Sequence, residues 1–262
     1  MTKKEKDQFK IDIEEMARCG VHLGHRSSKC LPKMKPYVLR VKGSDHIHII
    51  NLEITAQKLK EALNFIQNLV KDGKIILFVG TRPGIQHLVK DLAVECGFPY
   101  VENRWIGGTF TNFKVIKKRV DYLKELEKKR EEGELEKYTK KERLQFDREI
   151  QSLEEKFGGI KSLEKLPDAL FIVDMSREKT ATREAKRKGI PIIAIVDTNV
   201  DPTLADFPIP ANDDAITAVK YILDKVKEAI LKVKEPRTPP ARRAGKNPAR
   251  PSPSVGEQEP NK

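Results

Sequence analysis

The stretch NRWIGGTFTNFKVIKKR, residues 103–119, combines groups that suit phosphate binding. Gly107 and Gly108 would let the backbone come close to a phosphate. Free N–H groups at the start of the helix that follows would favour an anion, and short polar side chains could cap that helix. These capping candidates are Thr109, Thr111 and Asn112. Such a loop can cradle a nucleotide in an enzyme, or it can lie against the phosphates of a folded RNA.

The charged side chains of this stretch are all basic. They are Arg104, Lys114, Lys117, Lys118 and Arg119. A helix does not favour cations in its first turn, so an external polyanion explains these residues better than the helix itself does. Arg104 and Trp105 could contact sugar or phosphate, or stack on an unpaired base. The alternative for Trp105 is a buried plug where the following helix leaves the sheet.

A second basic stretch, residues 22–40, has the Gly, Ser and Pro content of a loop. Its candidate RNA-binding residues are His22, His25, Arg26, Lys29, Lys33, Lys35 and Arg40. Cys19, His22, His25 and Cys30 are also of the types that bind zinc, but their spacing matches no strong zinc pattern. We therefore expect the two histidines to pack or to contact RNA, and we predict neither a metal nor a cofactor.

Three carboxylates follow apolar runs that read as strands: Asp174, Asp197 and Asp201. At the carboxyl ends of parallel strands they could hold a metal ion for phosphoryl chemistry. Aspartates after a strand more often make Asx turns or cap helices. The chain has neither a G-x-G-x-x-G fingerprint nor a Walker phosphate loop, so the turn interpretation is favoured and no small-molecule substrate is predicted.

The elements that must position these residues alternate between strands and helices. KIILFVG, DALFIVD and PIIAIVD are continuous apolar runs, as buried parallel strands should be, and a last edge strand is expected around residues 207–209. Amphipathic segments separate them. The sequence therefore predicts an α/β fold with a Rossmann- or flavodoxin-like, mostly parallel sheet.

The Lys- and Glu-rich region between these strands has a different pattern. Apolar residues step by four and three there, which predicts an inserted antiparallel helical hairpin, a coiled coil, over residues 113–157. The globular α/β domain would comprise residues 11–112 and 158–233. A charged arm, 1–10, and a disordered Pro- and Arg-rich tail, 234–262, would flank it.

The composition points to a polyanionic partner. The 262-residue chain carries a net charge of +12, with 34% charged and 38% hydrophobic residues. Nucleic acid is the first expectation for so basic a protein. No apolar run approaches a membrane span, and the N-terminus has no secretory h-region, so no membrane partner is expected. Three scattered cysteines do not make a disulfide framework, and the cytosol is the expected compartment.

Several blocks resemble a known family when they are taken in order. These are IEEMARCGVHLGHRSSKCLPKMKPY, IHIINL, ILFVGTR, NRWIGGTFTNF and PDALFIVDMSREKTATREAKRKGIPIIAIVDTNVDP. Together, from about residue 11 to 231, they resemble the bacterial-type second protein of the small ribosomal subunit. Cys30 stands where many members have an aromatic residue, and the tail after residue 234 is an extension.

The resemblance implies a structural ribosomal protein with no catalytic activity and a role in translation. It implies binding to small-subunit rRNA between head and body, contacts with neighbouring ribosomal proteins, and help in anchoring the mRNA-capturing first small-subunit protein. The implied RNA-contacting regions are the basic residues of 22–40 and the block 104–118. Cytoplasmic and organelle ribosomes are both open on this basis. Two alternatives are a phosphoryl-handling enzyme at Asp174 and Asp197, and an adaptor that works through the helical hairpin.

Overall fold

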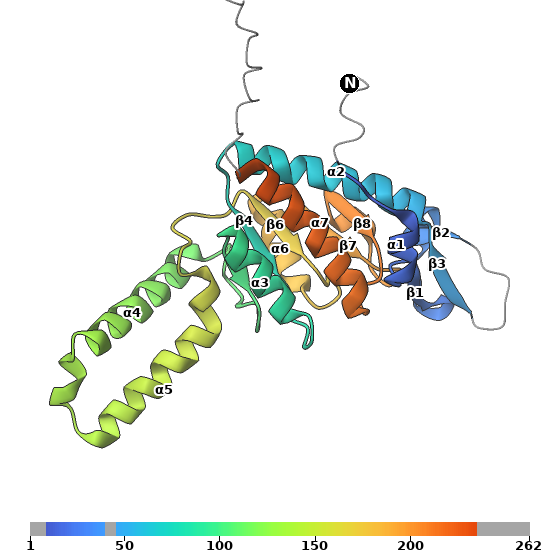
Figure 1. The fold of residues 1–262 in the computed structure, drawn as a ribbon. Helices are drawn as coiled ribbons and strands as arrows, with labels where there is room; N and C mark the ends of the chain where they lie inside the picture. The colour runs from blue at the N-terminus through green and yellow to red at the C-terminus, as the bar shows by residue number, and fades with distance from the viewer. Residues whose placement is uncertain (1–8, 40–45, 235–262) are drawn as a thin grey trace, which may run out of the picture.

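A computed structural model describes residues 9–39 and 46–234 (Figure 1). Most of the predicted charged arm, nearly all of the predicted tail and the candidate residue Arg40 lie outside these residues. The body is built on one five-stranded sheet with the order β5-β4-β6-β7-β8, in which every pairing is parallel. The predicted Rossmann-like α/β architecture is therefore confirmed.

The strands coincide with the apolar runs of the sequence. They are β4 (Ile76–Val79), β5 (Tyr100–Val101), β6 (Ala169–Ile172), β7 (Ile192–Val196) and β8 (Phe207–Pro210). All residues of β4, β6 and β7 are buried, because helices cover both faces of the sheet. The edge strand expected near residues 207–209 is β8.

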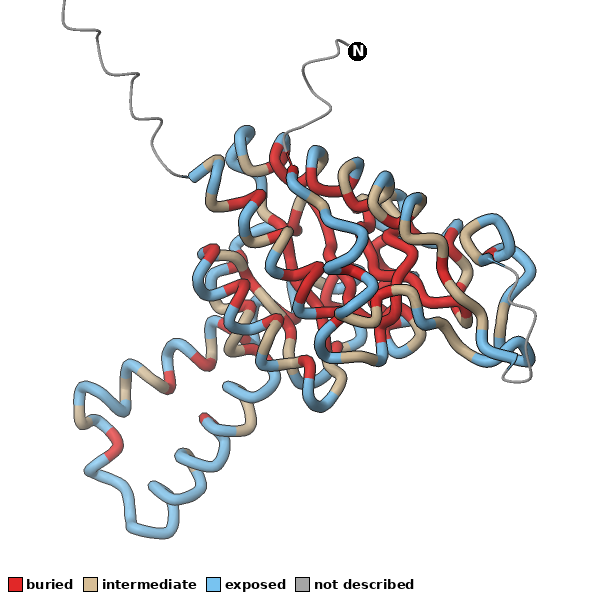
Figure 2. The backbone as a smooth tube through the Cα atoms, turned by 45° about the vertical axis from the view of Figure 1, so that its right-hand side comes forward, coloured by how far each residue is buried: buried red, intermediate tan, exposed pale blue. Residues whose placement is uncertain are grey.

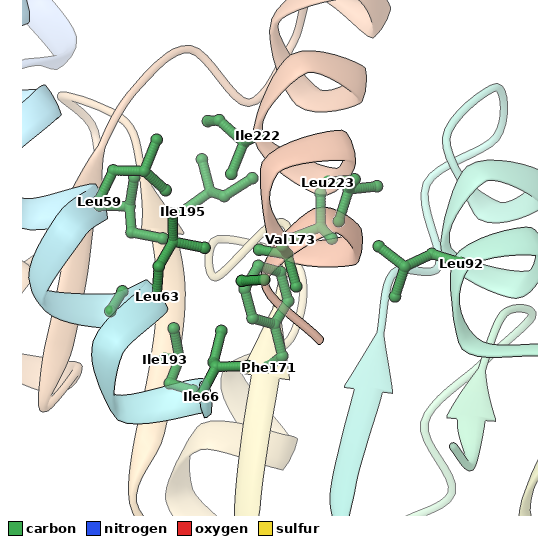
Figure 3. Packing of buried hydrophobic residues seen from close by; sticks show 14 of the residues in the cluster. Leu59, Leu63, Ile66, Leu92, Phe171, Val173, Ile193, Ile195, Ile222 and Leu223 are labelled. Carbon is green, nitrogen blue, oxygen red and sulfur yellow. The ribbon is translucent and has the colours of Figure 1, made fainter. Parts of the chain in front are cut away.

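Alternate strand residues point into two hydrophobic clusters, one on each face of the sheet. Phe78, Phe171 and Ile195 belong to the first cluster, and Leu77 and Leu170 belong to the second. Figure 3 shows the first cluster, where Phe171 and Ile195 meet side chains from the covering helices. Each fully buried large apolar side chain contributes roughly 1.5–3 kcal/mol, so the two faces together hold the sheet in place.

Five helices cover the sheet and its margin. They are α1 (Ile13–Arg18), α2 (Leu52–Lys71), α3 (Gln86–Cys96), α6 (Lys179–Lys188) and α7 (Ile216–Lys234). Residues of α1, α2, α3 and α7 fill the first cluster, whereas α6 places Ala181 and Ala185 in the second. Gly97 and Gly189 end α3 and α6 in the left-handed conformation, which glycine adopts without strain.

Two further helices, α4 (Phe113–Glu131) and α5 (Lys140–Phe157), lie side by side and project from the body (Figure 1). Figure 2 shows that most of their surface is exposed. The buried residues include positions that the sequence pattern had marked, among them Ile116, Leu123 and Ile150. A capping box between Thr139 and Glu142 begins α5.

Residues 22–50 form more structure than the sequence predicted. A three-stranded antiparallel sheet with the order β1-β3-β2 joins β1 (Leu23–Arg26), β2 (Val38–Leu39) and β3 (Ile47–Ile50). Two 3-10 helices, η2 (Ser27–Lys29) and η3 (Pro32–Tyr37), lie between β1 and β2. The loop prediction for residues 22–40 was wrong at β1 and β2, because strands of two to four residues carry too little periodicity to be seen. The alternation of His46 and His48 with Ile47 and Ile49 also predicts a short strand here, and β3 confirms it, although Ile47 is exposed and the buried residue is Ile50, on the other face of the strand.

Candidate nucleic-acid interface

Trp105 and Thr109 of the glycine loop point into the protein. The Trp105 side chain is 7% exposed, and its ring meets that of Phe110 edge-on with 4.9 Å between centroids. The Thr109 hydroxyl donates to the Ile106 carbonyl at 2.6 Å. Trp105 therefore has the position of the plug, and its buried ring has no free face on which a base could stack.

The N–H groups that the sequence offered to a phosphate are held by a side chain of the protein. The Glu184 carboxylate, on α6, accepts hydrogen bonds from the backbone N–H groups of Gly108 at 2.7 Å, Phe110 at 2.9 Å and Thr111 at 3.1 Å. The Trp105 ring N–H lies 3.4 Å from the same carboxylate. An internal anion thus occupies the expected phosphate position at these groups, and the prediction of an external phosphate there was wrong.

The capping role expected for Thr109, Thr111 and Asn112 was also wrong, for a related reason. The Thr109 hydroxyl bonds back to the preceding turn and the Thr111 hydroxyl donates to Glu184 at 3.2 Å. The Asn112 side chain makes no capping hydrogen bond to α4. Gly108 has a φ of +94°, a left-handed conformation that suits glycine and allows the loop to turn around Glu184.

Glu184 is a structural residue of the glycine loop that the sequence did not reveal. Burial by itself would raise the pKa of this carboxyl, but the hydrogen bonds from Gly108, Thr111 and Phe110 outweigh that effect and hold its pKa below the ordinary value. The only sequence signal is an acid among the small residues Ala181 and Ala185 on the buried side of an otherwise basic helix. Its partners lie more than 70 residues away in the chain.

We expect Glu184→Gln to lower the free energy of unfolding by about 3 kcal/mol at pH 7, because an amide NH2 would face N–H donors that need an acceptor. Since the folded-state pKa is depressed, the carboxylate stabilises the protein above its unfolded-state pKa. This contribution is lost as the pH falls through the folded-state value. Urea denaturation from pH 3 to pH 7 measures both effects, with Glu131→Gln, an exposed glutamate of α4, as the control. Equal stability of the Glu184 variant and the wild type would contradict this assignment.

The basic side chains of the loop and of α4 face solvent. Arg104, Lys114, Lys117 and Lys118 are exposed, and none makes an ion pair with another described residue. Lys117 reaches only the carbonyl oxygen of Glu164, at 3.5 Å. Gly107 is exposed as well, and a Cβ built there would meet no atom within 4 Å. These groups are free to meet an external ligand.

The second basic stretch is divided between exposed and engaged side chains. Arg26, Lys29 and Lys35 are exposed and make no ion pair within the described part of the chain. Lys33 lies 2.6 Å from an Asp201 carboxylate oxygen, so an internal acid offsets its charge, and the pKa of Asp201 falls to about 2. Met34 is fully buried and anchors the stretch. Of the candidates in this stretch, the side chains of Arg26, Lys29 and Lys35 are therefore the best placed to meet a polyanion.

The two candidate histidines do not belong to this exposed set. The His25 Nδ1 atom lies 3.0 Å from Asp197, and its Nε2 atom lies 3.4 Å from Asp214. The backbone N–H of His25 also donates to the Thr198 hydroxyl at 2.9 Å, which ties β1 to the loop after β7. His22 is half-buried, and its Nδ1 atom has no hydrogen-bond partner. His25 thus has a structural position between the two sheets.

Asp174 and Asp201 make local turns, as the favoured interpretation predicted, whereas Asp197 bonds the adjacent Thr198 and the His25 ring. Asp174 accepts from the N–H of Arg177 at 3.1 Å, Asp197 from that of Thr198 at 2.5 Å, and Asp201 from that of Thr203 at 3.0 Å. Each of the three carboxylates therefore accepts a hydrogen bond from a nearby backbone group, which favours the turn interpretation over the phosphoryl-handling alternative.

One group of side chains has the composition of a metal site. Ligand atoms of His25, Asp197 and Asp214 lie within 4.8 Å of one another, and within the described ranges no other cluster of three such residues occurs. Cys19 and Cys30 do not join it, so the zinc set considered from sequence is not assembled. Imidazole and carboxylate groups can bind zinc, but hydrogen bonds between ring and carboxylates already account for this arrangement.

Tertiary packing brings the two basic stretches to the same face of the sheet. Met34 from the second stretch and Trp105 and Phe110 from the glycine loop are members of the same hydrophobic cluster. The Lys33 ammonium also lies 3.4 Å from the Thr203 hydroxyl, beside the η6 turn (Pro202–Leu204). Two stretches that lie about 70 residues apart in sequence are thus anchored in the same hydrophobic cluster.

The fold and these surfaces define a class of protein. It is a basic Rossmann-like α/β protein whose strand-end carboxylates are hydrogen-bonded within the protein and whose unpaired lysine and arginine side chains face solvent. Within the residues that the structure covers, no helix combines the length and apolar character that a bilayer crossing requires. Residues 16–233 match the family model of ribosomal protein S2, and the chain therefore belongs to that family.

Curated relatives agree with this membership. The chain is 46% identical over 227 residues to small ribosomal subunit protein uS2 of Dictyoglomus thermophilum, covering 87% of this chain and 92% of that one. It is 43% identical over 227 residues to small ribosomal subunit protein uS2 of Coprothermobacter proteolyticus, covering 87% and 84%. The protein is thus a structural component of the small ribosomal subunit with a role in translation, and it is not an enzyme.

Proposed function

We propose that this protein binds small-subunit rRNA through the exposed lysine and arginine side chains of its two basic stretches. The observation that carries the proposal is their common anchoring. Met34, Trp105 and Phe110 fix both stretches in one cluster, while most of the basic side chains of the two stretches stay unpaired and exposed. From the first stretch the contacts would come from Arg104, Gly107, Lys114, Lys117 and Lys118, and from the second they would come from Arg26, Lys29 and Lys35.

The mechanism is electrostatic and geometric. Each lysine or arginine side chain that neutralises an rRNA phosphate releases a condensed counterion, which makes binding favourable and dependent on salt. Such contacts fix position and orientation and carry no sequence information by themselves. The rigid sheet, buried on both faces, sets the spacing of the contacts. RNA shape, rather than base identity, would therefore determine where the protein binds.

The proposal extends to the surroundings of the protein on the subunit. It would lie between head and body, contact neighbouring ribosomal proteins, and help to anchor the mRNA-capturing first small-subunit protein of a cytoplasmic ribosome. We divide the chain into the α/β domain of 11–112 and 158–233 and the inserted helical hairpin of 113–157. The hairpin would pack as an antiparallel coiled coil and offer a second contact surface. Exposed apolar side chains such as Leu144 and Tyr138 near its tip support that role.

Sedimentation of the tagged protein from a cell lysate tests the proposal. In a sucrose gradient at moderate salt it should travel with the small subunit, and high salt should release it, because phosphate contacts weaken as salt rises. A protein that stays at the top of the gradient at both salts contradicts the proposed rRNA binding.

We expect Gly107→Ala to weaken binding to small-subunit rRNA about tenfold, which corresponds to about 1.4 kcal/mol, without changing folding stability. A Cβ at this position would meet nothing in the free protein, and its φ lies outside the left-handed region, so only a ligand that approaches the backbone would sense it. Filter binding and urea denaturation measure the two quantities.

Gly108→Ala is the contrasting variant. Its φ of +94° makes a side chain unfavourable by roughly 1–2 kcal/mol, so this variant should lose folding stability. If Gly107→Ala binds rRNA as tightly as the wild type, the loop backbone does not approach the RNA.

A further inference from the structure

The solvent-facing side of α6 consists of basic residues and one threonine. Its exposed charged residues are Lys179, Arg183, Lys186, Arg187 and Lys188. The first four are spaced i, i+4, i+7 and i+8, which puts them on one stripe of the helix. Ala181, Thr182, Glu184 and Ala185 form the buried side. The single acid of the helix therefore points inward and none offsets the stripe.

This stripe is not neutralised by the rest of the described protein. None of the five exposed basic residues of α6 makes an ion pair with a described acid, whereas lysines of other helices do, as in Lys58–Glu61 and Lys129–Glu125. Lys186 donates only to the carbonyl oxygen of Thr203, at 3.2 Å. Like charges at i, i+4, such as Lys179 with Arg183 and Arg183 with Arg187, destabilise a helix, so the arrangement opposes helix stability.

The helix dipole explains only part of the pattern. Lys186, Arg187 and Lys188 lie in the last turn, where cations interact favourably with the negative end of the helix. Lys179 begins the helix and Arg183 lies in its middle, so the dipole gives no reason for these two. An external polyanion along the whole stripe accounts for all of them.

The position of α6 connects the two basic stretches. On one side, Glu184 holds the glycine loop through its backbone N–H groups. On the other, Lys186 contacts Thr203, which also lies beside Lys33 of the second stretch. In Figure 1, α6 lies centrally, with α4 and α5 on one side of it and the small sheet on the other. The basic stripe thus occupies the space between the proposed contact regions.

We propose that the exposed face of α6 is the central phosphate-binding surface of the rRNA interface. This inference rests on the proposed function, and it adds a helix that the sequence did not single out. The ligand is the RNA sugar–phosphate backbone, because the stripe offers cationic donors, two of them guanidinium groups that can grip phosphate oxygens in pairs. Its exposed residues include neither an acid nor a large apolar group, so the stripe lacks the aromatic and apolar anchors on which protein interfaces usually depend.

A charge-matched pair of variants tests the proposal. The first replaces Lys179, Arg183 and Arg187 with glutamine, which keeps a good helix former and spares the Lys186 contact. The second replaces Lys71, Lys220 and Lys232, which lie on α2 and α7 over the opposite face of the sheet, with glutamine. Both lose three positive charges. Binding of the full-length proteins to purified small-subunit rRNA is measured across salt concentrations, with thermal unfolding as the folding check.

The α6 variant should bind at least about thirtyfold more weakly than the wild type near physiological salt, with a salt slope lower by about two to three, since about 0.9 counterion is released per phosphate contact. The control should stay within about threefold, and both should unfold like the wild type. Equal affinities of the two variants, with wild-type binding intact, overturn the α6 proposal and leave the proposed function standing. Failure of the wild type itself to bind rRNA overturns the proposed function instead.

Discussion

Replacing Arg104, Lys114, Lys117 and Lys118 together with alanine is expected to weaken rRNA binding roughly a hundredfold or more at physiological salt. Four phosphate contacts change the slope of log K against log salt by about 3 to 4, and the affinity falls with them. The variant should correspondingly fail to enter the small subunit at normal levels.

Folding should survive this change. All four side chains are exposed, and none makes an ion pair with another residue in the described ranges. Lys114 lies in the first turn of α4, where a cation opposes the helix dipole, so its removal should leave stability unchanged or slightly higher. Filter binding, gradient sedimentation and urea denaturation give the three quantities.

The matched control replaces Lys71, Lys74, Lys220 and Lys232 with alanine. It carries the same net charge change on or beside helices that cover the other face of the sheet. If the variant that replaces Arg104 and the three lysines of α4 enters subunits as well as the wild type does, these four residues are not part of the binding site. If both variants lose binding equally, overall charge rather than this surface drives the association.

Asp213→Asn should change how stability depends on pH. Asp213 is 3% exposed, and burial, followed by the negative charges of Asp174, Asp197 and Asp214, raises its pKa to about 8, although Arg82 opposes the shift. A carboxyl whose pKa is raised on folding binds more protons in the folded state. Its stabilising contribution is therefore complete below the unfolded-state pKa and is lost as the pH rises toward 8.

Charged groups around Asp213 also contribute to the pH dependence of the unfolding free energy. The Arg82 guanidinium lies 3.7 Å from the Asp213 carboxylate and 3.8 Å from that of Asp174, and it donates to the Asp213 carbonyl at 2.9 Å. It also contacts Asp214, which faces His25. Burial likewise raises the pKa of Asp197, so that residue acts in the same direction. Only the difference between variant and wild type isolates Asp213.

The asparagine variant and the wild type should have similar unfolding free energies only below about pH 4, where the Asp213 carboxyl is protonated in both the folded and the unfolded state. The variant should then gain on the wild type as the pH rises, with a slope of at most about 1.4 kcal/mol per pH unit, and the two curves should become parallel above pH 8. Urea denaturation at intervals from pH 5 to pH 9 measures this. A difference that stays constant across that range would show that Asp213 does not titrate within it.

The strands of the central sheet could be predicted because each carries its own signal. A strand that is covered on both faces, such as Phe78 with its neighbours in β4, reads as a continuous apolar run. In the small sheet only β3 has a signal of its own, the alternation of isoleucines and histidines. Strands β1 and β2 are short, and Leu23 and Leu39 are exposed, so they carry no apolar run.

The interface divides in the same way. Basic charge, glycine spacing and family membership are properties of the linear sequence, so the sequence alone was enough to point to Arg104 and the lysines of α4. It could not reveal the burial of Trp105, the use of His25 between two sheets or the anion supplied by Glu184, since each depends on which distant segment packs against it.

The sequence by itself determined the α/β class, the family and the presence of two basic stretches, because these follow from local pattern and composition. Only the tertiary structure decided that both stretches are anchored in one hydrophobic cluster. It also decided that the basic side chains of α6 lie between them. The physical reason is that helix–sheet packing joins residues remote in sequence, and it alone determines which charges are neutralised internally and which remain unpaired in solvent.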